Sequence, residues 1–274
     1  MIPYEGQIAR DGANIAYWVY GEGVPLLLLM GLATPAESWG PLPGILARQG
    51  YQVIVVDNRD CGKSGECAEG YTMADMADDA VAILDSLSIQ SAYVLGISMG
   101  GFIAQELVLN HPERVERLLL VSTGPGIGGG VAAEESFLME IFVGISGDPV
   151  EAQRKVVRLL VGSEFRESAE DLLEVAATHR SVNSQTPAGF LRQLQAVVEF
   201  SSWDRLHEIK IPVLLLHGDA DPLVPVGNGV NLAERIEGAE LRIFEGAGHL
   251  LPLERPAEVI TALVEFLPVT QGAK

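Results

Sequence analysis

The segment Ala92-Tyr-Val-Leu-Gly-Ile-Ser98-Met-Gly-Gly-Phe-Ile-Ala104 decides the fold of this 274-residue chain. A short apolar run ends in Gly-x-Ser-x-Gly and passes directly into a helical pattern, which predicts a sharp strand-to-helix turn that exposes the hydroxyl of Ser98. A Cβ at Gly96 or Gly100 would collide with a neighbouring strand or helix, and we expect strained backbone at the serine. The three fixed letters alone would occur by chance in roughly one such chain in five. The surrounding pattern therefore has to support the prediction.

Composition restricts the possible classes of protein. Apolar residues make up 48% and charged residues 20%, which is typical of a globular chain. The 18 basic and 37 acidic residues give a net charge of −19, which repels nucleic acid and anionic membranes but identifies no substrate. No run approaches the length of a membrane span, and the first residues lack a signal-peptide pattern. We therefore expect a cytoplasmic protein without a nucleic-acid partner, in which Cys61 and Cys67 are free thiols.

Short apolar runs without polar alternation predict parallel strands that are covered on both faces. Helical patterns separate them, one capped by Thr72 with Asp75 three residues later and the last one opened by Pro256. Asp11-Gly12 predicts a hairpin turn between two strands near the start of the chain. The fold class is therefore α/β, a mostly parallel doubly wound sheet. The expected parallel strands cover residues 24–30, 51–57, 92–95, 117–122, 211–217 and 241–244.

One long segment interrupts the alternation of strands and helices. From about residue 126 to 202 no convincing strand run is present, only helical periodicity. The last of these helices carries Phe190, Leu191, Leu194 and Val198. The sequence thus predicts a helical cap (126–202) inserted into a core formed by 1–125 and 203–274. The glycine cluster that precedes the cap matches a dinucleotide fingerprint only in its letters, because Pro125 interrupts it and no strand follows the next helix; we expect no cofactor site.

A serine hydroxyl needs a general base, and five histidines are available. His249 lies in the loop Glu245-Gly-Ala-Gly-His-Leu-Leu-Pro252, after a predicted strand, where it can reach the same sheet edge as Ser98. The other four fit structural roles better. His111 ends a helix, His217 closes a strand, and His179 and His207 lie in or beside the cap. We therefore predict His249 as the base.

The base in turn needs a carboxylate to orient it. His217-Gly-Asp219-Ala-Asp221-Pro follows a strand and offers two candidates. Asp221 lies farther into the loop, and Pro222 makes the exit from the loop rigid, so we predict Asp221 as the acid. Asp219 directly follows the glycine, and we expect its side chain to stabilise the turn.

At this point the chain resembles the α/β-hydrolase superfamily, over nearly its whole length except the cap. The order Ser98, Asp221, His249 is the one expected for that fold. Members place the acid at the last Asp of Gly-x-x-Asp, which agrees with the choice of Asp221. They also carry an Asp-x-Arg-x-x-Gly-x-Ser turn, present here from Asp57 to Ser64, which the resemblance assigns a structural role.

Acyl transfer requires two preorganised N–H donors for the developing oxyanion. One is expected to be the backbone N–H of Met99, which follows the nucleophile. The resemblance places the other in the loop after the strand at residues 24–30, here on Leu32, with Ala33 as an additional candidate. Met30 stands where the family usually has a histidine that braces this loop.

The leading hypothesis is hydrolysis of small or medium carboxylic esters through an acyl-enzyme, without metal or cofactor. Apolar pocket candidates are Trp39, Phe137, Met139 and Phe142. The resemblance leaves open enol-lactone hydrolysis, meta-cleavage C–C hydrolysis and cofactor-free haloperoxidase or perhydrolase activity on the same triad. A small-ligand receptor of this fold is a further alternative. Natural substrate and oligomeric state are not predicted.

Overall fold

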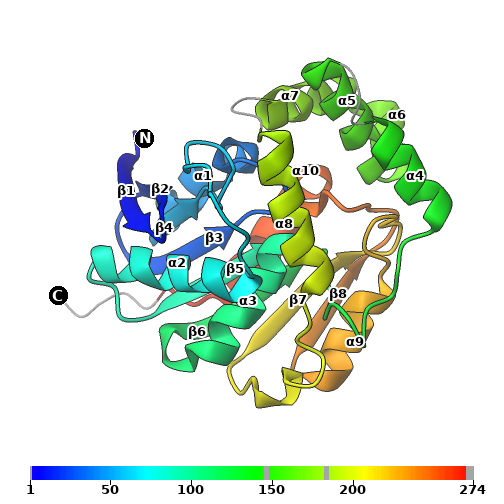
Figure 1. The fold of residues 1–274 in the computed structure, drawn as a ribbon. Helices are drawn as coiled ribbons and strands as arrows, with labels where there is room; N and C mark the ends of the chain where they lie inside the picture. The colour runs from blue at the N-terminus through cyan, green and yellow to red at the C-terminus, as the bar shows by residue number, and fades with distance from the viewer. Residues whose placement is uncertain (1, 145–147, 182–184, 270–274) are drawn as a thin grey trace.

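An eight-stranded sheet forms the centre of the molecule, with its strands in the order β1-β2-β4-β3-β5-β6-β7-β8 (Figure 1). The computed structural model describes residues 2–144, 148–181 and 185–269. Only β1–β2 and β2–β4 pair antiparallel, so the predicted mostly parallel sheet is confirmed. The strands are β1 (Tyr4–Arg10), β2 (Ala13–Tyr20), β3 (Val24–Leu29), β4 (Tyr51–Val56), β5 (Ala92–Ile97), β6 (Val115–Val121), β7 (Val213–Gly218) and β8 (Glu240–Phe244).

Helices cover both faces of the sheet because successive strand residues point to opposite sides. In β3, Leu27 and Leu29 join the core on one face, whereas Leu26 and Leu28 join the core on the other. The first face is covered by α2 (Met73–Ser86), α3 (Met99–Asn110) and α9 (Gly227–Arg235). The second is covered by α1 (Leu42–Arg48), α10 (Leu251–Glu254) and α11 (Pro256–Phe266). Short 3-10 helices span Ala36–Trp39, Pro112–Arg114 and Leu206–Glu208.

Two local sequence signals are confirmed. The Thr72 hydroxyl accepts a hydrogen bond from the Asp75 N–H, and the Asp75 carboxylate accepts one from the Thr72 N–H, which is a capping box. Asp11 and Gly12 both have positive φ, 44° and 81°, between the paired residues Arg10 and Ala13. This is the two-residue hairpin geometry that matches the twist of the strands.

In the described part of the chain, five α-helices lie between β6 and β7, and we call them the inserted helical region. They are α4 (Glu135–Gly144), α5 (Pro149–Leu160), α6 (Ser163–Ser168), α7 (Glu170–Ser181) and α8 (Pro187–Glu199). In Figure 1, α4 to α7 lie together at the top of the molecule, and α8 runs from them toward the sheet. None of the described helices is long and apolar enough to cross a membrane.

The apolar residues of α8 do not all face inward. Leu191 and Val198 are 62% and 55% exposed. The buried positions of the helix are instead Gly189, Gln193 and Ala196. They follow the helical repeat, but they are small or polar, so hydropathy does not mark them. The helix therefore turns an amide side chain toward the core, and the partly buried Val197 packs against the same core.

The topology places four loops at one edge of the sheet. From β3 the chain moves to β4 on one side, and from β5 it moves to β6 on the other, so the adjacent strands β3 and β5 form a switch point. The loops that follow them meet at the carboxyl ends of the strands, where ligands of open α/β sheets bind. The loops after β7 and β8 reach the same edge.

Candidate active site

Ser98 lies in a strained turn between β5 and α3, with φ 54° and ψ −122°. A non-glycine residue in this region costs of order 1–3 kcal/mol and has to be held by its surroundings. A Cβ on Gly96 would lie 2.2 Å from the Gly100 carbonyl oxygen, and a Cβ on Gly100 would lie 2.1 Å from the Leu29 carbonyl oxygen. Both glycines are therefore sterically required, as the sequence predicts.

Hydrogen bonds to the end of β6 and to the residues that follow it hold the backbone of Ser98. Its N–H donates to the Val121 carbonyl at 3.0 Å, and its own carbonyl accepts from the Thr123 hydroxyl at 2.8 Å. The side chain of Ser98 stays only partly buried. The turn thus holds the backbone rigidly and leaves the hydroxyl accessible.

The structure brings two of the predicted residues into direct contact. Nδ1 of His249 lies 2.8 Å from Oδ2 of Asp221, and both residues are buried. The other oxygen of Asp221 accepts the backbone N–H groups of Leu223 and Val224, both at 2.9 Å. Because both oxygens are engaged, the carboxylate has a fixed orientation toward the imidazole.

Asp219 has a different role from the one expected. Its Oδ1 accepts the N–H of Gly246 at 2.7 Å, which ties the loop after β7 to the loop after β8. The turn-stabilising contacts expected of Asp219 are made by Asp221 instead, since Asp221 accepts the N–H groups two and three residues ahead. One oxygen of Asp221 thus orders its own loop, while the other reaches His249.

His217 is the other histidine near Asp221, with Nε2 at 3.7 Å from Oδ2. That nitrogen also lies 2.7 Å from the Val224 carbonyl oxygen, as a neutral imidazole N–H would. Burial lowers the pKa of His217, which keeps it neutral. His111 is engaged with Asp78 at 2.7 Å, away from this edge. These contacts agree with the structural roles predicted for both residues.

The loop carrying His249 is held by the inserted helical region. The His249 N–H donates to the Leu160 carbonyl at 2.7 Å. The buried carboxyl of Glu254 accepts the N–H groups of both Gly248 and Gly162, at 2.9 and 2.8 Å, and burial raises its pKa. Sequence reasoning missed Glu254. The imidazole position therefore depends on the contact between the inserted helices and the last turn of the core.

The loop after β3 forms a four-residue turn beside the serine. A Cβ on Gly31 would lie 3.1 Å from the Cβ of Ser98, so the two backbones are adjacent. The Thr34 N–H donates to the Gly31 carbonyl at 3.3 Å, and Ala33 has a φ of 54°. The Ala33 N–H donates to Oε1 of Gln193 at 2.9 Å. Among the described residues the Leu32 N–H has no acceptor, so of the two candidates only Leu32 offers a free donor.

Met30, which stands where the family usually has a bracing histidine, contributes to this loop by packing and through its backbone. Its side chain is buried in the core beneath the loop, and its carbonyl accepts from Nδ2 of Asn58 at 2.9 Å. Asp57, at 0% exposure, accepts the N–H groups of Ala36 and Lys63 at 2.7 and 2.6 Å. Burial raises the pKa of Asp57 to about 6, although these two hydrogen bonds oppose the shift. The segment from Asp57 thus supports the loop.

Several other expectations can be compared with the structure. In the described part of the chain Ser98 Oγ makes no hydrogen bond with His249, a contact that often tightens only when substrate binds. Cys61 and Cys67 are free thiols, as expected, and both are buried. Trp39 is buried in the core, Met139 is 59% exposed, and the side chain of Phe142 lies outside the described residues.

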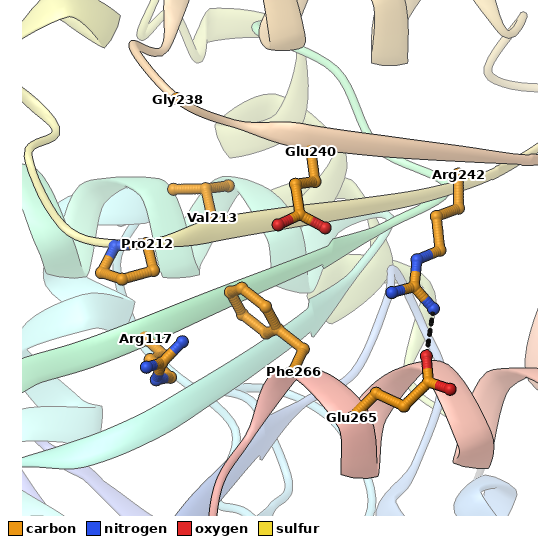
Figure 2. A pocket seen from close by; sticks show the side chains of 8 residues that line it. All are labelled: Arg117, Pro212, Val213, Gly238, Glu240, Arg242, Glu265 and Phe266. Carbon is orange, nitrogen blue, oxygen red and sulfur yellow. Dashed lines mark hydrogen bonds and ion pairs between the residues drawn. The ribbon is translucent and has the colours of Figure 1, made fainter.

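The pocket of Figure 2, lined by Arg117, Glu240 and Glu265 among others, lies at the amino ends of β6 to β8, far from these loops.

These features define an α/β protein with a partly buried serine in a strained strand-to-helix turn and a carboxylate-oriented histidine at the same edge. The alpha/beta hydrolase fold family matches residues 24–256, and the chain belongs to this family. A relative from Azorhizobium caulinodans named "Putative carbamate hydrolase RutD" is 30% identical over 258 residues, covering 89% of this chain and 91% of its own.

Two further similarities are informative. Rhodomycin D methylesterase DnrP of Streptomyces peucetius is 29% identical over 274 residues, covering 88% of this chain and 91% of its own. The solved structure of Est816, described as an N-acyl homoserine lactone degrading enzyme, has a TM-score of 0.82 and 34% identity. It covers 96% of this chain and 100% of that one. The chain is an alpha/beta hydrolase, and its relatives carry the names of different hydrolytic activities.

Proposed function

We propose that the chain hydrolyses carboxylic esters of small or medium size through an acyl-enzyme. The hydrogen bond between His249 and Asp221 carries this proposal, because it orients a buried imidazole at the sheet edge where Ser98 lies. The elbow and the two loops come from three different strands. Their convergence supports a site for nucleophilic catalysis.

In the proposed reaction, Ser98 Oγ attacks the ester carbonyl while Nε2 of His249 takes its proton. Asp221 holds the ring in the tautomer with the proton on Nδ1 and stabilises the imidazolium that forms. The N–H groups of Leu32 and Met99 receive the developing oxyanion; Met99 is the first residue of α3, where an N–H has no partner within the helix. The imidazolium then protonates the departing alcohol, and water hydrolyses the acyl-enzyme by the same route.

The size of the substrate is inferred from the inserted helical region, which we propose acts as a cap spanning residues 126–202. Its contacts with the loops carrying Leu32 and His249 support a position over the edge that carries Ser98. Such a cover favours compact esters over long triglycerides. The methylesterase relative is consistent with ester cleavage. A lactone is the second candidate, since it is a cyclic ester and the lactone-degrading structure covers nearly the whole chain.

The first test is labelling of the purified protein with a fluorophosphonate, followed by mass-spectrometric mapping of the adduct, beside a panel of p-nitrophenyl esters and lactones. We expect a single adduct on Ser98. Ser98→Ala should lower ester hydrolysis by about four to six orders of magnitude, on the scale of other triad deletions. Hydrolysis near the wild-type rate in Ser98→Ala would overturn the proposal.

The acid is tested by a matched pair of substitutions in one loop. Asp221→Asn should reduce kcat by roughly 10⁴-fold, because an amide stabilises the wrong tautomer of His249. Asp219→Asn can retain its acceptor oxygen for the Gly246 N–H and should stay within about threefold of wild type. A severe loss in Asp219→Asn alone would reassign the acid.

A further inference from the structure

Gln193 is a fully buried amide on α8 whose two polar ends both bind the core. Oε1 accepts the N–H of Ala33 at 2.9 Å, and Nε2 donates to the Arg59 carbonyl at 2.7 Å. Its exposure is 0%, so these hydrogen bonds form away from water. Buried amides in such positions are costly unless fully satisfied, and this one has a partner at each end.

The peptide between Leu32 and Ala33 is held at both of its polar atoms. Its N–H, on Ala33, donates to Gln193, and its carbonyl, on Leu32, accepts from the Thr34 hydroxyl at 2.9 Å. The guanidinium of Arg180, from α7, donates to that hydroxyl at 2.6 Å. Burial lowers the pKa of Arg180 to about 10, which leaves it charged at neutral pH. Two side chains of the inserted helical region therefore fix this peptide plane.

Fixing this plane also fixes the direction of the preceding N–H. The carbonyl of Gly31 is engaged by the Thr34 N–H, so the peptide from Gly31 to Leu32 keeps only its N–H free. Ala33 holds a positive φ that a non-glycine residue leaves readily unless contacts oppose it. Loss of the Gln193 contact would free the peptide between Leu32 and Ala33 to rotate, and the adjoining peptide that carries the Leu32 N–H beside Ser98 would lose a fixed neighbour.

We propose that Gln193 is a positioning residue for the oxyanion donor, through which the inserted helices set the geometry of the loop after β3. This rests on the proposed function, since it assumes that the Leu32 N–H receives an oxyanion. Met30 packs into the core and has no side-chain donor or acceptor suited to bracing the turn. The brace is supplied from α8 instead.

The chain offers a matched control for Gln193. Gln105, on α3, is also at 0% exposure and also bridges two segments. Its Nε2 donates to the carbonyls of Gly101 and Gly124, and its Oε1 accepts from the Ser202 hydroxyl. Gln105 makes no contact with the turn from Gly31 to Thr34 in the described structure. Replacing either amide by methionine removes buried hydrogen bonds at nearly constant volume.

The experiment compares Gln193→Met with Gln105→Met. Both should lower the melting temperature, because each leaves buried backbone groups unpaired. Only Gln193→Met should lower kcat, by roughly 10- to 100-fold with KM within about threefold, since an oxyanion donor acts in the transition state. The affinity of a boronic acid inhibitor that mimics the tetrahedral intermediate should fall in parallel with kcat/KM. Equal kcat losses in both variants, or none in either, would overturn the proposal.

A second variant covers the case in which Gln193→Met does not fold. Gln193→Glu keeps the shape and, when protonated, both hydrogen bonds; ionisation removes the donor to the Arg59 carbonyl and adds charge near the oxyanion. The neighbouring charges are the Arg192–Asp60 and Arg59–Asp79 pairs and Arg180. The ratio of its kcat to that of wild type should fall at least about tenfold as pH rises from roughly 6 to 9.

A flat kcat ratio across this range would contradict the positioning role of Gln193. The two proposals can be separated experimentally. If no fluorophosphonate adduct forms on Ser98, the proposed function itself is wrong. If an adduct forms on Ser98 but the Gln193 variants keep the kcat of wild type, only the positioning role of Gln193 is wrong.

Discussion

Ser98 lies within one tight turn and beside a second, and the two turns are stabilised in different ways. The turn from Gly96 to Gly100 is fixed by close approach of backbone to backbone, with no room for a single added Cβ. The turn from Gly31 to Thr34 is fixed by side chains that come from distant parts of the chain, among them Arg180 and Gln193. The first should therefore be intolerant of added atoms, and the second should be sensitive to the loss of remote partners.

The largest effect is expected from adding one methyl group to the first turn. Gly100→Ala places a Cβ 2.1 Å from the Leu29 carbonyl oxygen, and backbone has to move to accept it. We expect a loss of roughly 3 kcal/mol or more in the free energy of unfolding, measured by urea denaturation. Gly70→Ala is the control, because nothing lies within 4 Å of its Cβ. Equal stability of the two variants would contradict this account of the turn.

This difference also explains what the sequence could reveal. The turn around Ser98 was predictable because the close approaches that surround it leave glycines at fixed places within five residues. Asp221 and His249 were predictable as residues on loops that follow strands, since the carboxyl ends of parallel strands share one edge. The hydrogen bond between them agrees with that expectation.

The support of the second turn could not be predicted in the same way. Gln193 lies 160 residues from Ala33, and it occupies a helical stripe of small and polar residues that a hydropathy pattern overlooks. A usable signal was present, because Gly189, Gln193 and Ala196 keep the helical repeat. The sequence does not show, however, that the backbone groups of Ala33 and Arg59 lie opposite this stripe and bind the Gln193 amide. The assignment of the turn-stabilising contacts to Asp219 failed for a related reason, since spacing does not show which of two carboxylates faces its own loop.

An intermediate effect is expected from Asp57, which supports the end of the second turn. The pKa of its carboxyl is raised to about 6 in the folded state, mainly by burial, from an ordinary value of 3.8. The folded state therefore holds the proton longer than the unfolded state between pH 4 and 6. The stability due to the protonated group is fully present below about pH 4 and is lost as pH rises through 6.

Asp57→Asn removes the titrating carboxyl, so a comparison of the variant with wild type isolates the contribution of this group to the pH dependence of stability. The free energy of unfolding of wild type minus that of Asp57→Asn should decrease by roughly 2 kcal/mol between pH 4 and 6, out of about 3 kcal/mol for the whole shift of about two pKa units. Urea denaturation at half-unit pH intervals measures the difference. A difference that stays constant, or that grows with pH, would show that the two backbone hydrogen bonds outweigh the burial of the carboxylate.

The smallest effect is expected at Ala33. Its φ of 54° is strained for alanine and relaxed for glycine, so Ala33→Gly should stabilise the fold by up to about 1 kcal/mol. Ala82→Gly, inside α2, should instead destabilise by about 1 kcal/mol. Thermal unfolding of the two variants provides the comparison, and equal losses would show that Ala33 carries no strain.

The activity of Ala33→Gly then shows what the strain does. If side chains from the inserted helices hold the second turn, kcat should stay within about threefold of wild type, because glycine accepts the same φ and keeps the N–H that Gln193 binds. If alanine itself held the turn, the added freedom would lower kcat while the fold became more stable. Stability and activity should therefore separate at this position, whereas at Gly100 both should be lost together.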